Sequence, residues 1–268
     1  MILQLLAPER LTEVVDIGAN PIDGDPPYKP LLDAGLCRVT GFDPQFRQVT
    51  YDGDRERYFP YAVGDGRRHT LSVCRAPGMT SLLEPDPDQL AMFDFLRPLA
   101  DVTKLVEMST HRLDDLTEIQ HMDFLKIDIQ GSELSVFCNG AERLARAVCV
   151  QTEVSFVPLY RNQPTIGDVD CELRRQGFIP HCCVQVVKRP IGHTVVNGDP
   201  SLGLNQLVEA DMVYIRLEGL DHEQWKHLAL IAHHCYRSYD LAAYCIEKME
   251  GLGLAPRDAS QSYLARAA

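Results

Sequence analysis

The sequence has few basic side chains for its length. Its 26 lysines and arginines are outnumbered by 38 aspartates and glutamates, which gives a formal net charge of −12 at pH 7. The basic runs at residues 67–69 and 174–175 are too short to form a patch. Because such a surface repels phosphates, we expect no nucleic-acid partner.

Long apolar runs are also absent. The apolar residues 1–8 are far too few to span a bilayer, and they lack the basic start of a signal peptide. The nine cysteines are odd in number and follow no repeating framework, which is typical of reduced thiols. We therefore expect a soluble, cytoplasmic protein with no membrane partner.

The composition itself is that of a globular protein. The 268 residues, 45% hydrophobic and 24% charged, suffice for one large α/β domain and a small appendage. Apolar runs that suit buried parallel strands alternate with helical segments. We expect five parallel strands and a closing antiparallel pair, at residues 13–17, 37–42, 57–63, 124–129, 147–154, 178–187 and 210–217. The prediction is a seven-stranded, mostly parallel sheet.

Acidic side chains stand at the carboxyl ends of several predicted strands. Asp16 and Asp128 each precede a glycine turn, at Gly18 and Gly131, and Asp43 ends the second strand. Ligands of open α/β sheets bind at this edge of the sheet. We therefore expect one cleft lined by these acids.

The loop after the first strand lacks the glycines of a dinucleotide-binding site. Pyrophosphate binding needs G-x-G-x-x-G, whereas residues 18–23 read GANPID, and Asp23 and Asp25 would repel phosphate. An NAD-dependent oxidoreductase is therefore disfavoured. S-adenosylmethionine (SAM) carries no phosphate, and its sulfonium and ammonium groups are cationic, so acids around it are favourable.

Two motifs in this order, DIGAN at residues 16–20 and KIDIQGSE at residues 126–133, resemble the FkbM family of SAM-dependent methyltransferases. The resemblance covers roughly residues 12–217 and includes residues 62–65, residues 112–116 and Glu153. It implies a Rossmann-like class I methyltransferase fold, SAM as the cofactor, and O-methylation of a hydroxyl on a small molecule or glycan. The alternative is a non-catalytic binding or scaffold protein that keeps the fold; the intact strand-end acids argue against it.

This resemblance predicts that the cofactor binds at the strand ends. The expected contacts are Asp16, Gly18, Ala19, Asn20, Asp43, Asp65 and Asp128. Asp43 suits the ribose, because one carboxylate can accept hydrogen bonds from both hydroxyls. Asp65, after the third strand, is placed to meet the adenine amino group. Asp16 orders the glycine loop or holds the ammonium group.

Acceptor chemistry is expected beside the cofactor. Gln130 and Glu133 are predicted to bind the acceptor, although Glu133, in the first turn of a helix where the dipole favours its charged form, could instead fix the turn. The hydroxyl must lose a proton, and Asp128 or Glu153 is the favoured base. His193, in the long loop at 188–208, is the next candidate. Partial burial of Glu153 would raise its pKa toward a useful range. We expect no metal site.

Residues 219–268 depart from the sheet pattern. They read as a helical hairpin, with helices at about 221–234 and 239–250 and a third short helix after them. Because the seven strands end by residue 217, we divide the chain into a methyltransferase domain, 1–218, and a helical appendage, 219–268, and expect the sheet core to be complete without the appendage. Three roles stay open for it: packing on the core, docking a partner, and forming a homodimer.

Overall fold

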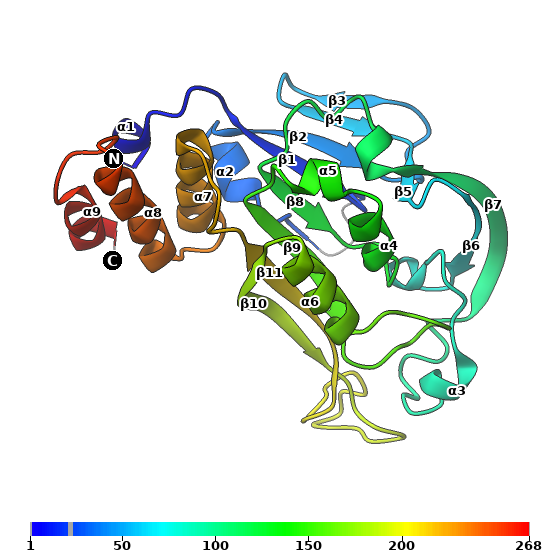
Figure 1. The fold of residues 1–268 in the computed structure, drawn as a ribbon. Coiled ribbons are helices and arrows are strands. Elements are labelled where there is room, and N and C mark those ends of the chain that lie inside the picture. Colours follow the sequence, from blue (N-terminus) through cyan, green and yellow to red (C-terminus); the bar gives the residue numbers. More distant parts are fainter. Residues whose placement is uncertain (1, 21–23, 268) are drawn as a thin grey trace.

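The computed structural model describes residues 2–20 and 24–267. Its centre is an eight-stranded sheet in the order β10-β11-β9-β8-β1-β2-β4-β3, and a three-stranded sheet, β5-β7-β6, lies beside it (Figure 1). The strands of the large sheet are β1 (Thr12–Ile17), β2 (Cys37–Phe42), β3 (Thr50–Asp52), β4 (Glu56–Phe59), β8 (Phe124–Ile127), β9 (Cys149–Ser155), β10 (Ile179–Lys188) and β11 (Leu207–Ile215). The interpretation of the loop at 18–23 falls in part on residues 21–23, which lie outside the described residues.

Five neighbouring strands, β9, β8, β1, β2 and β4, run parallel. The strand β11 then pairs antiparallel with both β9 and β10. The predicted mostly parallel sheet with a closing antiparallel pair is therefore confirmed. The central strands β1, β8 and β9 are buried along almost their whole length, in agreement with their nearly continuous apolar sequences.

The predicted third strand at residues 57–63 is broken in two. Pro60 has no N–H to donate to a sheet ladder, and the chain leaves the large sheet there. Beyond it, β5 (Ala62–Gly64) pairs with β7 (Val102–Arg112), and β6 (Arg68–Cys74) completes the small sheet. The large sheet gains its eighth strand from β3, which pairs antiparallel with β4.

Short helices cover one face of the large sheet (Figure 1). They are α4 (Glu133–Cys138), α5 (Ala141–Leu144) and α6 (Ile166–Arg175). Their buried residues Val136 and Leu173 pack in one cluster with Ile17 and Leu125 of the sheet. Other short elements are the helix α3 (Pro87–Leu90) and two 3₁₀ turns at Pro77–Met79 and Leu113–Asp115. Among the helices of residues 2–20 and 24–267, none is long and apolar enough to cross a membrane.

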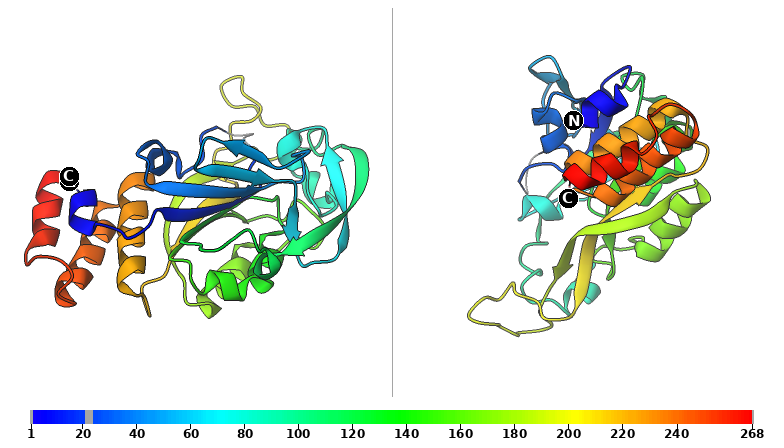
Figure 2. Two further views of the ribbon diagram at one scale, coloured as in Figure 1. Left: turned by 90° about the horizontal axis from the view of Figure 1, so that it is seen from above. Right: turned by 90° about the vertical axis from the view of Figure 1, so that its left-hand side faces the viewer.

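The C-terminal helices pack against the end of the sheet at which the parallel strands begin (Figures 1 and 2). They are α7 (His222–Cys235), α8 (Tyr239–Gly251) and α9 (Ala259–Ala267), with α1 (Ile2–Leu6) and α2 (Lys29–Asp33) beside them. Val14 and Phe124 of the sheet belong to the same buried cluster as Leu228 and Ile246 of these helices. The expectation that the sheet core is complete without residues 219–268 is therefore wrong, because the strand starts bury their apolar side chains against α7 and α8.

Buried polar side chains also fix α7 to the start of β1. His227 of α7 is fully buried, and its Nδ1 lies 3.0 Å from the Oγ1 of Thr12. Beside it, Arg10 donates from Nη2 to Asp123 Oδ1 at 2.8 Å. Asp123 Oδ2 accepts from the Glu13 backbone N–H at 2.8 Å. Burial lowers the pKa of His227, so the imidazole that shares a hydrogen bond with the Thr12 hydroxyl is neutral.

Leu228→Ala should lower the free energy of unfolding by about 2–5 kcal/mol, because it leaves a cavity between α7 and the sheet. The matched control is Leu252→Ala, at a side chain that is 61% exposed, where we expect a change within about 0.5 kcal/mol. Urea unfolding followed by circular dichroism measures both.

A chain cut after residue 218 should lose its near-ultraviolet circular dichroism signal, because the strand starts would no longer be buried against α7 and α8. A cut chain that keeps this signal and unfolds cooperatively would show that residues 1–218 form a complete core without the C-terminal helices.

Candidate functional site

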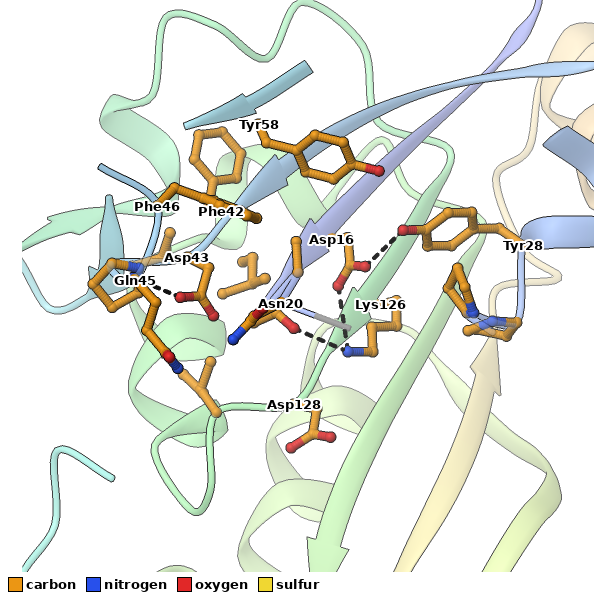
Figure 3. A pocket seen from close by; sticks show the side chains of 18 of the residues that line it. Asp16, Asn20, Tyr28, Phe42, Asp43, Gln45, Phe46, Tyr58, Lys126 and Asp128 are labelled. Atoms are coloured by element: carbon orange, nitrogen blue, oxygen red, sulfur yellow. Dashed lines mark hydrogen bonds and ion pairs between the residues drawn. The ribbon is translucent and has the colours of Figure 1, made fainter. Parts of the chain in front are cut away.

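A cavity of 1090 Å³ opens along the carboxyl ends of β1, β2 and β8 (Figure 3). This is the edge at which the sequence predicts a cleft. The residues predicted to contact the cofactor that line it are Asp16, Gly18, Ala19, Asn20, Asp43 and Asp128. Its volume is at the upper end of the roughly 300–1,000 Å³ typical of ligand sites, so it has room for a cofactor and a second molecule.

The turn after β1 requires a glycine. Gly18 has a φ of +81°, and its N–H donates to the Phe42 carbonyl at 2.9 Å. A Cβ at this position would lie 2.0 Å from the carbonyl oxygen of Asp128, where no side chain fits. The turns that follow β1 and β8 are therefore packed directly against each other.

Asp16 lies at the floor of the cavity and is only 3% exposed. Tyr28 donates its hydroxyl hydrogen to Asp16 Oδ2 at 2.7 Å, and Lys126 Nζ lies 3.4 Å from Oδ1 (Figure 3). Burial raises the pKa of Asp16, and Lys126 and Tyr28 oppose this rise. Oδ1 makes no hydrogen bond within the described residues, and the Lys126 ammonium is its ion-pair partner.

Asp43 is buried at the end of β2 and faces the same cavity. Its Oδ1 accepts from the Gln45 backbone N–H at 2.7 Å, which holds the carboxylate in place (Figure 3). Burial raises the pKa of Asp43, and backbone N–H groups of Gln45 and Asn20 counteract this. Phe46 and Tyr61 supply aromatic surface to the cavity near this end.

Gln130 is held in a left-handed backbone conformation, with a φ of +56°, which is uncommon for a residue with a side chain. Ser81 donates its hydroxyl hydrogen to the Gln130 carbonyl at 2.6 Å, and Tyr160 donates its own to Gln130 Oε1 at 3.4 Å. Two segments far apart in sequence thus fix this turn. Gln130 is among the residues that line the cavity, and its contact with the acceptor stays a prediction.

Three carboxyl groups converge around Gln130. Its Nε2 donates to Asp128 Oδ1 at 2.9 Å and lies 3.3 Å from Glu153 Oε2. Asp128, Glu133 and Glu153 each offer an oxygen within 4.8 Å of the others. The absence of a metal stays a prediction, because oxygens at this spacing could also surround a cation. Burial, and then repulsion by Asp128 and Glu209, raise the pKa of Glu153 well above its usual value.

Glu133 faces its own turn rather than the cavity. Its Oε1 accepts from the backbone N–H groups of Ile129 at 2.9 Å and Gly131 at 3.2 Å. It is not among the described residues that line the cavity, so of its two predicted roles the structure supports fixing the turn. Burial raises the pKa of Glu133 to about 7, and the backbone donors oppose this rise. The expected dominance of the helix dipole is wrong, because a six-residue helix cannot offset nearly complete burial.

The structure does not bring Asp65 to the cavity. After the break at Pro60 the chain turns into the small sheet, where Asp65 Oδ1 accepts from His69 at 2.7 Å and from the Arg67 backbone N–H at 2.9 Å. Burial would raise the pKa of Asp65, but these bonds and one from Thr110 outweigh it and lower that pKa. In the described cavity lining, Ala62 and Val63 occupy this corner instead.

His193 also lies elsewhere. Its side chain is 96% exposed and forms an ion pair with Asp94. The loop at 189–206 runs past the ends of β10 and β11, and Gly192 donates its N–H to the Met92 carbonyl at 2.9 Å. Among the described residues, the lining of the cavity does not include His193, which removes the geometric basis for a role as base.

Lys126 is a lining residue that the sequence analysis does not single out. Side chains alternate along a strand, so Phe124, Lys126 and Asp128 share one face of the sheet. Phe124 belongs to the core shared with α7, and the two polar residues continue that face into the cavity. Gln151 on β9 pairs with Lys126 and also lines the cavity. A charged residue inside an apolar run is the sequence signal that marks this position.

The donor set fits a cofactor with a cationic centre and hydroxyl groups. Asp16, Asp43 and Asp128 at the strand ends are among the acidic residues that line the cavity, and Asp16 Oδ1 is buried without a hydrogen bond among the described residues. The same acids would repel a pyrophosphate. The arrangement agrees with SAM and disfavours a dinucleotide.

Two comparisons with known proteins found matches to this chain. A family model described as the methyltransferase FkbM domain matches residues 16–180, more than half of the chain. A solved structure of a provisionally assigned methyltransferase from Thermoplasma acidophilum is similar, with 11% identity and a TM-score of 0.37, covering 79% of this chain and 70% of that one. No curated protein matches.

Glu133→Gln should remove part of the pH dependence of stability. The folded state holds the proton of Glu133 up to about pH 7, whereas the unfolded chain releases it near 4.5. The stabilisation linked to this proton is therefore complete below about pH 4.5, is lost as the pH rises to about 7, and amounts to about 3 kcal/mol at most. Urea unfolding at pH 5, 6, 7 and 8 should show a shallower decline for Glu133→Gln than for the wild type.

Glu142→Gln, at an exposed glutamate of α5, is the matched control and should decline like the wild type. Equal slopes for Glu133→Gln and the wild type would contradict the raised pKa of Glu133.

Proposed function

The chain belongs to the FkbM methyltransferase family, and we propose that it transfers a methyl group from SAM to a hydroxyl of a small molecule or glycan. The observation that carries this proposal is the convergence of Asp16, Asp43 and Asp128 on one cavity at the carboxyl edge of the sheet. SAM, when bound, supplies an electrophilic methyl group on a positively charged sulfur.

The cofactor would be held by the strand-end turns. The carboxylate of Asp43, fixed by the Gln45 N–H, would accept the two ribose hydroxyls. Phe46 and Tyr61 offer aromatic faces for the adenine. Acids around the sulfonium would stabilise its charge and exclude phosphate-bearing competitors.

Asp128 is the base that the geometry favours. It lines the cavity, whereas Glu153 lies behind the Gln130 amide and is absent from the described lining. Burial, and then repulsion by Asp128 and Glu209, raise the pKa of Glu153, which disfavours the charged form that a base needs. Gln130 donates to Asp128 Oδ1 and leaves Oδ2 to take the hydroxyl proton of the acceptor. Much of the rate would come from holding that oxygen in line with the methyl group.

Asp43→Ala should weaken SAM binding by about 1–3 kcal/mol, the scale of losing charge-assisted hydrogen bonds. Isothermal titration calorimetry with SAM and S-adenosylhomocysteine measures it. The matched control is Asp65→Ala, whose carboxylate bonds to His69 in the small sheet and should leave binding unchanged. Wild-type affinity in Asp43→Ala would show that the ribose lies elsewhere, and weaker binding in Asp65→Ala would return the adenine contact to Asp65.

Asp128→Asn should slow methyl transfer by about a hundredfold, the usual contribution of a positioned base. Single turnovers at saturating [methyl-³H]SAM, with an acceptor found by labelling a panel of hydroxyl compounds and glycans, measure the chemical step. Glu153→Gln and His193→Ala are the controls and should transfer at close to the wild-type rate. A slow Glu153→Gln beside a fast Asp128→Asn would make Glu153 the base. Wild-type rates in all three would leave proton removal to solvent.

A further inference from the structure

The cavity continues beyond the proposed cofactor site, across the other half of the sheet. Its lining there includes Gln151 of β9, Asp211 of β11, and Val184 and Gln185 of β10. Two consecutive residues of β10 reach the cavity because the pairing of β10 with β11 shifts between Cys183 and Gln185. A bulge of this kind re-aims side chains and is common beside functional sites. We call the part of the cavity lined by Gln151, Val184, Gln185 and Asp211 the distal half.

The cavity carries a large excess of negative charge. Eight acidic and three basic residues line it within the part of the chain that the structure describes. SAM has a sulfonium, an ammonium and a carboxylate group, so it would bring a single net positive charge. A cleft lined by charges of one sign raises the local concentration of ligands with the opposite charge. With the proposed cofactor bound, this cavity would therefore still attract a cation.

Acidic side chains gather around the distal half. Asp211 of β11 stands opposite Glu153 of β9, and Glu209 lies on the same face of β11 as Asp211. Burial raises the pKa of Glu209; Arg189 opposes this rise, and the negative charge of Asp128 adds to it. A cation bound beside these carboxyl groups would relieve their repulsion.

A buried hydrogen-bond donor in the distal half points independently to a ligand. Gln151 is only 5% exposed, and Tyr236 donates its hydroxyl hydrogen to Gln151 Oε1 at 2.9 Å. This bond fixes the orientation of the amide and leaves Nε2 as its donor. Nε2 makes no hydrogen bond to the described residues and is not one of their fully buried atoms, so it is open to the cavity that Gln151 lines. An amide N–H₂ of this kind donates to oxygen atoms, such as those of a hydroxyl or an ether.

Asp128 and Asp211 lie at the same level of the sheet, two strands apart. Asp128 directly follows β8 at the level of Glu153, which pairs with Asp211. Neighbouring strands are about 4.8 Å apart, so roughly 10 Å separates the two backbone positions. A hydroxyl at Asp128 and a cation at Asp211 would therefore belong to different parts of one molecule, such as two neighbouring rings.

We propose that the methyl acceptor is a cationic hydroxyl compound, an amino sugar or an aminated oligosaccharide, whose ammonium binds at Asp211 and one of whose oxygens accepts from Gln151 Nε2. The ammonium matches the negative charge of the cavity, and the oxygen matches the donor that Tyr236 holds in place. This inference rests on the proposed function, because it assumes that the methylated hydroxyl lies at Asp128.

The test uses pairs of acceptors that differ only in the charge of the amine. N-acetylation turns an ammonium into a neutral amide and leaves every hydroxyl in place. A panel of amino sugars and aminated oligosaccharides, from chitobiose and chitotriose to kanamycin, is offered with [methyl-³H]SAM beside the N-acetylated form of each. Wild-type kcat/KM should be about 10- to 100-fold higher for the amine, the range for one charge-assisted contact. This advantage should shrink as the salt concentration rises.

Asp211→Asn should lower kcat/KM for the amine about 10-fold and leave that for the acetylated form unchanged. The matched control is Asp33→Asn, at another lining acid, which is paired with Lys29 on the surface and should alter neither value because solvent and salt screen its charge. Gln151→Leu should raise KM about 10-fold for both forms, because both keep the oxygen atoms. All three variants should bind S-adenosylhomocysteine like the wild type in calorimetry, which also shows that they are folded.

Four results would overturn the inference. Wild-type protein that methylates the acetylated forms as well as the amines, or that binds SAM and methylates neither, would show that the acceptor is not an amine of this class. An equal loss for both forms in Asp211→Asn would mean that Asp211 only shapes the cavity. Loss of S-adenosylhomocysteine binding in Asp211→Asn would assign its charge to the cofactor. Failure of the proposed function is distinct, because the wild type would then bind neither SAM nor S-adenosylhomocysteine.

Discussion

Direct contact between two turns holds this site together. The turn after β1 can approach the turn after β8 only because Gly18 has no side chain, since a Cβ there would lie 2.0 Å from the Asp128 carbonyl oxygen. The parallel register of the two strands sets Asp16 opposite Lys126, and each lies two residues before the residue that makes that contact. The cavity floor, its ion pair and the position of Asp128 all follow from this one close approach.

The electrostatics of the site follow from placing several acids at one sheet edge of a chain with a net charge of −12. Buried carboxylates so close together cannot all ionise. Lys126 offsets Asp16 and Asp128, backbone N–H groups hold Asp43 and Glu133, and burial raises the pKa of Glu153. Each acid thereby has a different environment, and Asp128 lines the cavity with its Oδ1 held by the Gln130 amide.

The C-terminal helices support this site from the far end of the sheet. They close the core at the strand starts, and Tyr236, directly after α7, donates its hydroxyl hydrogen to Gln151 Oε1 at 2.9 Å. Gln151 in turn pairs with Lys126 and lines the cavity. The segment that looks like an appendage in sequence is thus a structural part of the fold and reaches to the floor of the site.

The sequence by itself determined the strands that carry the site, because nearly continuous apolar runs and glycine turns are local properties of the chain. It also determined that Asp16, Asp43 and Asp128 share an edge, since parallel strands bring their carboxyl ends together. Only the tertiary structure decided what each side chain faces. Pro60 diverts Asp65 into the small sheet, a long loop carries His193 away, and Glu133 turns back on its own backbone. The apolar faces of α7 and α8 have the same sequence pattern whether they pack on the sheet or on another chain, because an apolar pattern predicts burial but not the surface that buries it.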